Sequence, residues 1–458
     1  MTIKPLSTLF ARGIALAIAM MMMSGAAAGG EIDDLKRQVE MLQSRLAQVQ
    51  AQLDKLAKAQ AKAKPAATAK QPEARAVEVK AKPGIEIATK NKQFTAHVGG
   101  RLMADAAWYN EDKSALGNGT ELRRVRIYIS GTAFRDWAYK NQFDFAGNKV
   151  TVKDAYLKYK GFKPVTLTVG NFKEPFSLEE LTSSKYITFM ERALPNVFAG
   201  SRHLGVGIST HGENWTLAAG AYGDTVSADP GEEGDEGWDL AARGTVALGC
   251  SRACLHLGLG VRYRNPDDTS TVRFRERPES HIIDVRFVDT GTLGDVDNLF
   301  QLGSEAALIY GPLSVQGEYM RVWVNRKGAL ADLDFNGWYT QLSYFLTGES
   351  RSYAPAKGSF GRLKPKSPVG RGGLGAWEVG VRYSSLDLTD SSVLGGEAKN
   401  ITLGLNWYLN SHIRFMWNAI WVNNDANATG NLANLHITET VAGDDDPFIF
   451  QMRAQVDY

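Results

Sequence analysis

Apolar and polar residues alternate strictly along the last segment of the chain, residues 448–458. One face of an extended strand would carry Phe448, Phe450, Met452, Ala454, Val456 and Tyr458. The other face, Ile449 apart, would be polar, and an aromatic residue at the end suits an interfacial girdle. The segment therefore predicts the last strand of an outer-membrane β-barrel. An edge strand of a soluble sandwich is the alternative.

The same period of two recurs from residue 93 onward, clearly so at 122–129, 165–169, 255–262, 338–346 and 401–409. Tight connections such as 161–164 and 311–312 take turns with long polar ones such as 224–237 and 423–446. Bacterial barrels show this asymmetry between short periplasmic turns and long external loops. We expect an all-β transmembrane β-barrel of about 16 antiparallel strands over residues 91–458.

Two connections depart from this scheme. Residues 348–375 fall on the side of the short turns, yet this connection is long and basic. Either the strand parity slips there or the barrel has an unusual periplasmic segment. Residues 171–202 carry more Phe, Leu, Ile and Met than an exposed loop requires. Because about 16 strands leave a lumen wide enough for water, we expect this loop to fold inward and form a constriction.

The first 90 residues predict three further segments. Lys4 and Arg12, the uncharged run 13–23 and the small residues 24–28 read as a signal peptide, residues 1–28, cleaved after Ala28. Residues 29–63 predict a periplasmic coiled coil, and the Ala-, Lys- and Pro-rich residues 64–90 predict a flexible basic linker. No later stretch approaches the roughly 18 apolar residues that a transmembrane helix needs.

The coiled coil rests on an unbroken heptad seam, in which apolar residues are spaced alternately by three and four. The seam consists of Ile32, Leu35, Val39, Leu42, Leu46, Val49, Leu53 and Leu56. A lone helix would leave this seam in water, so the segment predicts self-association. A helix packed on the underside of its own barrel is the alternative. Contact of this basic, extended region with peptidoglycan is a hypothesis that rests on charge and reach alone.

Charge and cysteine content narrow the chemistry only slightly. Without Lys4 and Arg12 the formal charge is 52 − 50 − 2 = 0, so any preference for anions must come from the arrangement of charges. The only cysteines, Cys250 and Cys254, could close a small disulfide loop in an oxidising compartment, or remain free thiols. No further Cys or His accompanies them at ligand spacing, so a metal site is disfavoured.

Residues 171–179 (Asn-Phe-Lys-Glu-Pro-Phe-Ser-Leu-Glu) and 182–192 resemble the constriction loop of the phosphate-selective porin O and P family. Residues 273–281 resemble a second segment of that family, and the resemblance runs from about Phe94 to Tyr458. It implies a homotrimer of sixteen-stranded barrels in the bacterial outer membrane. The inward loop of each barrel would form an anion site.

The site implied by the resemblance combines a lysine, two consecutive serines and an arginine eight residues later. Ser183, Ser184 and Arg192 match three of these positions, but Glu180 stands at the position of the lysine. A carboxylate there would repel phosphate unless it is paired or turned away, and Lys185 or Lys173 could substitute. The family also lines its entrance with arginines. The expected anion-binding and pore residues are Ser183, Ser184, Lys185, Arg192, Arg273, Arg275, Arg277, Arg123, Arg124 and Arg126. Asp154 and Glu191 are expected to hold cations rather than solute.

We therefore expect a channel for passive diffusion of small anions, phosphate or polyphosphate, with no enzymatic activity, cofactor or metal. Arginine forks and serine hydroxyls can replace part of a phosphate's hydration shell, and several spaced cations allow release as well as entry. The expected partners are a second and third copy of the chain, small anions and outer-membrane lipid, with no nucleic acid.

Three alternatives stay open. Glu180 and the acidic run 232–236 favour a weakly selective general porin. The coiled coil and basic linker favour a tether between the outer membrane and the cell wall. An outer-membrane enzyme is disfavoured, because none of the histidines, which include His203, His211 and His281, lies in a recognisable nucleophile motif.

Overall fold

The computed structural model describes residues 37–38, 40–45, 47–52, 54–55, 77–81, 83–226, 235–250, 253–370, 372–425 and 444–458. The predicted signal peptide, most of the heptad seam, residues 64–76 of the linker and residues 232–234 of the acidic run lie outside this part. The chain divides into two compact units, Met1–Glu73 and Ala74–Tyr458. In the first unit the described residues are helical, and the seam residues Leu42 and Val49 are exposed. Pairing of this helix stays a prediction.

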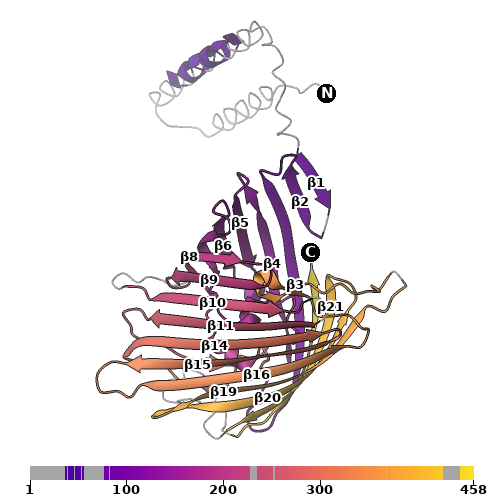
Figure 1. Cartoon of the computed structure of the whole chain (residues 1–458). Coiled ribbons are helices and arrows are strands. Elements are labelled where there is room, and N and C mark those ends of the chain that lie inside the picture. Colours follow the sequence, from indigo (N-terminus) through magenta and orange to yellow (C-terminus); the bar gives the residue numbers. More distant parts are fainter. Residues whose placement is uncertain are drawn as a thin grey trace, which may run out of the picture. The chain divides into compact units, whose positions relative to one another are not determined.

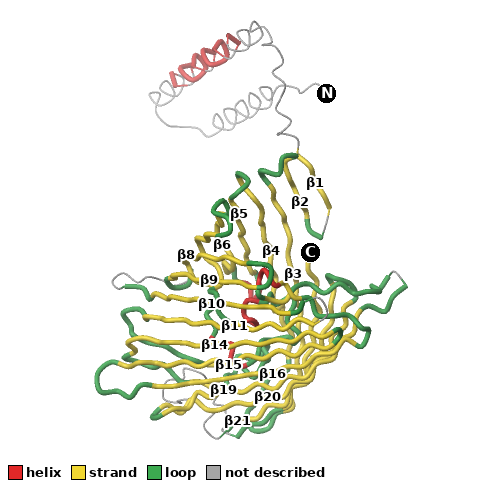
Figure 2. The backbone as a smooth tube through the Cα atoms, in the orientation of Figure 1, coloured by secondary structure: helices red, strands yellow, loops and turns green. Residues whose placement is uncertain are grey.

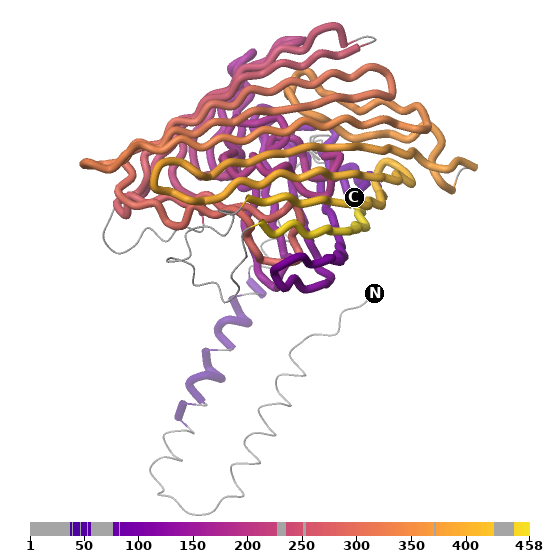
Figure 3. Tube along the Cα trace, turned by 90° about the horizontal axis from the view of Figure 1, so that it is seen from below, coloured from indigo at the N-terminus to yellow at the C-terminus, as the bar shows by residue number. Residues whose placement is uncertain are grey.

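Sixteen antiparallel strands of the described residues close into a barrel (Figure 1). In chain order they are β3 (Thr95–Asn110), β4 (Gly119–Ala133), β5 (Trp137–Asp144), β6 (Thr151–Tyr159), β7 (Thr166–Lys173), β8 (Arg202–His211), β9 (Trp215–Tyr222), β10 (Trp238–Leu248), β11 (Ala253–Asn265), β14 (Val296–Tyr310), β15 (Leu313–Arg326), β16 (Leu333–Phe345), β19 (Ala376–Asp390), β20 (Val393–Tyr408), β21 (Ile413–Asn424) and β22 (Phe448–Asp457). Each strand pairs with its neighbours in the sequence, and β22 pairs with β3 to close the ring, as the yellow and purple ends of the barrel show in Figure 3.

The C-terminal strand confirms the alternation read from the sequence. Ile449, Arg453 and Asp457 are buried on the side of the lumen, whereas Phe450 and Tyr458 are exposed on the outer face. This arrangement repeats around the barrel, where large exposed apolar side chains such as those of Trp108, Trp338 and Trp421 face outward. Within the described part of the chain, no helix combines the length and apolarity needed to cross a bilayer.

Residues 77–89 differ from the flexible linker expected there. They form a hairpin of β1 (Val77–Ala81) and β2 (Ile85–Thr89), with Gly84 at a positive φ in the turn. The β2 strand pairs with β3 from Thr95 to Val98, just beyond Arg101, where the pairing of β3 with β22 ends. An unpaired stretch of strand edge is a template for a further strand, and the hairpin occupies it.

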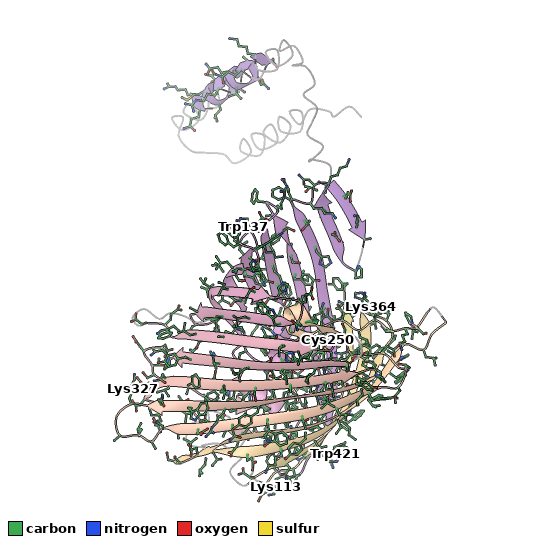
Figure 4. The ribbon with its side chains drawn as sticks, in the orientation of Figure 1. Lys113, Trp137, Cys250, Lys327, Lys364 and Trp421 are labelled. Carbon is green, nitrogen blue, oxygen red and sulfur yellow. A yellow bond between two sulfur atoms is a disulfide. The ribbon has the colours of Figure 1, made fainter. Side chains whose placement is uncertain are left out.

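The two ends of the barrel are different. One end, here called the turn end, carries Tyr458 and most of the short turns, and the other, the loop end, carries most of the long connections. Cys250 and Lys364 mark the turn end and Lys327 the loop end (Figure 4). A disulfide joins Cys250 and Cys254 at the turn between β10 and β11.

Residues 346–375, here called the insert, lie at the turn end. The alternation of strand directions is therefore as expected, and the insert is an unusually long connection for this end. It contains β17 (Tyr353–Ala354), η4 (Pro355–Lys357) and β18 (Ser359–Phe360). The insert enters the lumen: Arg243 of β10 donates to the carbonyl oxygen of Gly358 (2.7 Å), and Phe360 is buried. The insert therefore narrows the lumen from the turn end.

Candidate anion pathway

The connection from residue 174 to residue 201, here called the inward loop, lies inside the barrel. It contains α3 (Leu178–Leu181) and η3 (Leu194–Phe198), which Figure 2 draws in red within the strands. Phe176 is fully buried, and a Cβ atom at Gly260 or Gly303 of the wall would lie 3.0 or 2.8 Å from its ring. The apolar side chains of this loop therefore pack against the barrel, as the sequence predicted.

Polar side chains of the barrel wall hold the backbone of the inward loop. The carboxylate of Glu318 on β15 accepts hydrogen bonds from the N–H groups of Leu178 (2.9 Å) and Glu179 (2.7 Å). Asn418 on β21 accepts one from the N–H group of Met190 (2.9 Å). Buried backbone groups need such partners, so these hydrogen bonds fix the position of the loop against the wall.

The two predicted serines lie beside an arginine that the sequence prediction did not include. Arg101 of β3 donates to the hydroxyl oxygen of Ser184 (2.7 Å) and, at 3.5 Å, to that of Ser183. Arg101 is buried and forms no ion pair within the described residues. Its charge therefore remains available to an anion that reaches the serine pair.

Glu180, at the position of the family's lysine, is paired on both sides. Its carboxylate lies 2.8 Å from Lys173 and 3.2 Å from Arg192. Burial alone would raise the pKa of Glu180, but Arg192 and Lys173 lower it to about 2, so the carboxylate is ionised. Arg192 also donates to the carbonyl oxygens of Glu179, Glu180 and Thr182 (3.1, 3.2 and 3.3 Å). Arg192 thus braces the loop, and much of its charge is balanced by Glu180.

Lys185, a candidate substitute for the missing lysine, has a carboxylate partner on the last strand. Its ammonium group lies 3.1 Å from the carboxylate of Asp457 on the last strand, which also binds Arg362 of the insert. Lys185 is absent from the lining of the three cavities described below, whereas Lys173 lines two of them. Of the two candidate substitutes, Lys173 has the better position.

A β-bulge turns both Arg123 and Arg124 toward the largest of these cavities, which Lys173 also lines. In the register of β3 and β4, Ala104 lies opposite Leu122 and Met103 opposite Arg124, which leaves Arg123 without a partner. Adjacent residues of a regular strand point to opposite faces, and a bulge re-aims one of them. Both guanidinium groups approach Glu191, at 2.9 and 3.6 Å.

A second bulge does the same for Lys153 of β6. Gln142 lies opposite Asp154 and Phe143 opposite Val152, so Lys153 is the extra residue. Lys153 and Asp154 both line the same cavity. Asp154 is paired with Lys140 (2.5 Å) and Arg202 (2.6 Å), whereas Lys153 has no ion pair among the described residues.

These side chains surround a cavity of about 580 Å³ between the inward loop and the wall from β3 to β8, here called the central cavity. Among the described residues that line it, cations outnumber carboxylates by ten to two. The cations are Arg101, Arg123, Arg124, Arg126, Lys140, Lys153, Lys158, Lys173, Arg192 and Arg202, and the carboxylates are Asp154 and Glu180. Gln142 also lines it, and neither polar atom of that buried amide has a hydrogen-bond partner in the described part. A hydrated anion would meet a positive potential here, and the amide group of Gln142 could donate a hydrogen bond to it.

A smaller cavity of about 230 Å³, here called the outer cavity, shares Arg123, Arg124 and Arg192 with the central one. Arg277, Glu276 and His281 of the connection from β11 to β14 also line it. Burial raises the pKa of Glu276 to about 7. Three glutamates, Glu191, Glu276 and Glu279, line this cavity beside four arginines, so its described lining is less strongly positive than that of the central cavity.

The predicted arginine ladder reaches this cavity through Arg277. Arg273 is instead paired with Asp289 (2.5 Å), and Arg126 of the first hairpin with Asp144 (2.6 Å). Arg275 is exposed and has no ion pair within the described residues. A pore role for Arg273 and Arg275 stays a prediction.

The sequence prediction missed Arg101, Lys140, Lys153, Lys158 and Arg202, all of which line the central cavity. Arg101, Lys140 and Lys158 follow the period of two within their strands, so a lumen-facing position could have been read for each. Lys153 could not be found in this way, because its orientation depends on the bulge.

One buried cluster has the composition of a metal site. The ligand atoms of Glu174, His203 and Asp239 lie within 4.8 Å of one another. Arg262 reaches the same cluster, at 2.7 Å from Glu174 and 2.9 Å from Asp239. A guanidinium group at this place opposes a metal cation, so we assign the cluster to ion pairing.

The sequence profile described as phosphate-selective porin O and P matches residues 97–458. Porin O of Pseudomonas aeruginosa is 32% identical over 381 residues, which cover 73% of this chain and 84% of the relative. An uncharacterised protein of Caulobacter vibrioides is 31% identical over 446 residues, 90% of this chain and 89% of that protein. A solved anion-selective porin from Comamonas acidovorans aligns with 80% of this chain and 100% of its own, at 14% identity and a TM-score of 0.49. The profile spans nearly the whole barrel, and the chain belongs to the phosphate-selective porin O and P family.

Proposed function

We propose that this outer-membrane anion channel selects phosphate, or short polyphosphate, at the central cavity. The observation that carries the proposal is the excess of cations over carboxylates among the described lining residues, together with Arg101 beside Ser183 and Ser184. Arginine donates to phosphate through a planar fork, and serine donates without adding charge. The family and the fold are those of channels, and that agrees with this role.

The pattern of ion pairs supports conduction rather than tight binding. Arg192, Arg123 and Arg202 are each held by a carboxylate, whereas Arg101, Lys153 and Lys158 have no ion pair within the described residues. Conduction requires sites that attract an anion yet release it, and several moderate sites achieve this better than one deep site. Unpaired cations between paired ones provide such a series.

The experiment is a planar-bilayer measurement of chloride conductance in the purified full-length protein, with phosphate titrated into the bath. Block at low phosphate concentration, together with a reversal potential that favours anions in a KCl gradient, is the expected result. The triple variant Arg101→Gln, Lys153→Gln, Lys158→Gln should lose most of both properties. Anion selectivity that survives in this variant would contradict the assignment of the site.

A weakly selective porin is the second candidate. Glu180 favours it, because this carboxylate neutralises part of the charge of Arg192 and Lys173 at the position where the family has a lysine. Equal block by phosphate and by sulfate at the same concentration would support this candidate over phosphate selectivity.

We also propose a homotrimer whose N-terminal helices pair through the heptad seam in the periplasm. The exposure of Leu42 and Val49 supports an unfilled apolar seam in the single chain. Contact of the same region with peptidoglycan is compatible with its basic composition. Deleting residues 29–76 and comparing the mass of the detergent-solubilised protein with that of the full mature chain tests the seam, and a cosedimentation assay with isolated peptidoglycan tests the contact.

A further inference from the structure

A third cavity adjoins the central one on the side of the turn end. Its volume is about 350 Å³, and Lys158, Phe172, Lys173 and Leu181 line both. Ala356 and Lys357 of the insert contribute to its lining as well. We call it the inner chamber. A solute that leaves the central cavity toward the turn end would pass into it.

Three aromatic residues form a shelf along the two cavities: Phe172 and Tyr222 line the inner chamber, and Tyr156 lines the adjoining central cavity. The ring centroids of Tyr156 and Phe172 are 6.3 Å apart, and those of Phe172 and Tyr222 are 5.3 Å apart. A Cβ atom at Gly207 would lie 2.9 Å from the ring of Phe172, and one at Gly205 would lie 2.6 Å from the ring of Tyr222. The rings therefore lie against a part of β8 where side chains are missing, and the ring of Phe172 stays partly exposed.

The charges of the inner chamber are all positive among its described lining residues. Lys173 is engaged by Glu180, and Arg243 by Glu305 (2.5 Å). Lys158 and Lys357, by contrast, have no ion pair within the described part of the chain. The ammonium group of Lys158 lies 4.9 Å from the ring centroid of Tyr156, at one end of the shelf. Two available cations thus border an apolar surface.

Inorganic phosphate would use the cations but not the shelf, because it has no apolar surface to cover Phe172. A cavity of this volume falls in the range of sites for small organic ligands, which combine an apolar wall with a few polar groups. We propose that the inner chamber binds phosphate monoesters with a ring-shaped organic part. The ring lies on Phe172, and the phosphate group binds Lys158 and Lys357. This inference rests on the proposed anion channel and adds a solute class to it.

Phenyl phosphate and methyl phosphate separate the two contributions, because they carry the same charged group and differ in the ring. Each is titrated against the chloride conductance of the full-length protein in planar bilayers. An aromatic contact contributes roughly 0.5–1.5 kcal/mol, which corresponds to about a two- to tenfold lower half-blocking concentration for phenyl phosphate. Equal half-blocking concentrations in the wild type would overturn the proposal.

Two variants test the assigned residues. Phe172→Leu keeps an apolar side chain but removes the ring, and should abolish most of the preference while methyl phosphate blocks as before. Lys357→Gln, in an exposed turn of the insert, should weaken block by both esters and leave their ratio unchanged. A preference that survives Phe172→Leu would also overturn the proposal.

A matched control is Phe162→Leu, which alters an exposed phenylalanine at the turn between β6 and β7 and should change neither value. The proposed function fails separately from this inference. A wild-type channel without anion selectivity in a KCl gradient would contradict the anion channel itself. Anion selectivity with equal block by the two esters would contradict only the inner chamber.

Discussion

Replacing Glu180 by glutamine should strengthen anion binding in the central cavity. The carboxylate now offsets the charges of Lys173 (2.8 Å) and Arg192 (3.2 Å), and both of these cations line the cavity. With glutamine, both cations keep backbone partners, because Lys173 still donates to the carbonyl oxygen of residue 180 and Arg192 to three carbonyl oxygens of the loop. The variant therefore adds one unit of net positive charge without removing the brace.

The size of the effect follows from Coulomb's law. An anion that binds these cations would lie about 8 Å from the carboxylate, where the interaction of two unit charges is roughly 0.5 kcal/mol in water and roughly 2 kcal/mol at an effective dielectric constant of 20. Removing this repulsion should tighten phosphate block about two- to thirtyfold. Salt screens exposed charges over about 8–10 Å, so the gain should shrink at high KCl.

The assay is phosphate block of chloride conductance in planar bilayers, with reversal potentials in a KCl gradient as a second measure. Glu213→Gln is the matched control, since Glu213 is exposed in a short turn and should leave both values unchanged. The thermal stability of each variant is measured in the same detergent. If Glu180→Gln stays as stable as the wild type and phosphate block does not tighten, then Glu180 does not oppose anions in the cavity, and our account of the site is wrong.

Four further predictions concern the lumen and the disulfide. Lys153→Gln should lower the anion-to-cation permeability ratio without loss of thermal stability, because Lys153 has no ion pair in the described residues. Arg192→Ala should lower both the permeability ratio and the stability, and the loss of stability should be less than the roughly 3–5 kcal/mol of an uncompensated buried charge, because Lys173 still pairs with Glu180. Lys149→Gln, at an exposed position outside the strands, is the control. The pKa of Glu276 near 7 means that this group is neutral at pH 6 and anionic at pH 8, so the permeability ratio should rise as the pH falls, and Glu276→Gln should flatten the change. Cys250 and Cys254 should resist thiol labelling of the unfolded protein without reductant, and two labels by intact mass would contradict the disulfide.

The sequence predicted the barrel because its two faces meet different solvents. Lipid on one side and water or polar protein on the other impose a period of two on every strand, and the last strand shows this in Phe450 and Arg453. The inward loop was predictable for a related reason. Phe176 and Phe189 would have no apolar partner in an exposed loop, and they are buried against glycines of the wall.

The site was less predictable, because orientation there depends on single residues of register. Arg123 and Lys153 reach the central cavity only because of β-bulges, and the flanking sequence does not reveal the extra residue of either bulge. The pairing of Glu180 with Lys173 and Arg192 depends on how the loop folds back on itself. The β1–β2 hairpin was missed because its short alternating segments are bordered by residues with a linker composition.

The insert and the inward loop enter the lumen from opposite ends, yet they are held by a common residue. Asp457, on the water-facing side of the last strand, binds Lys185 of the inward loop and Arg362 of the insert. The backbone N–H group of Phe360 in the insert also donates to the hydroxyl oxygen of Thr182 in the loop (3.3 Å). Because a buried carboxylate with two cationic partners is costly to separate from either, movement of the insert would be coupled to the inward loop. The inward loop lines the central cavity, and both segments line the inner chamber, so a movement of the insert would alter both cavities.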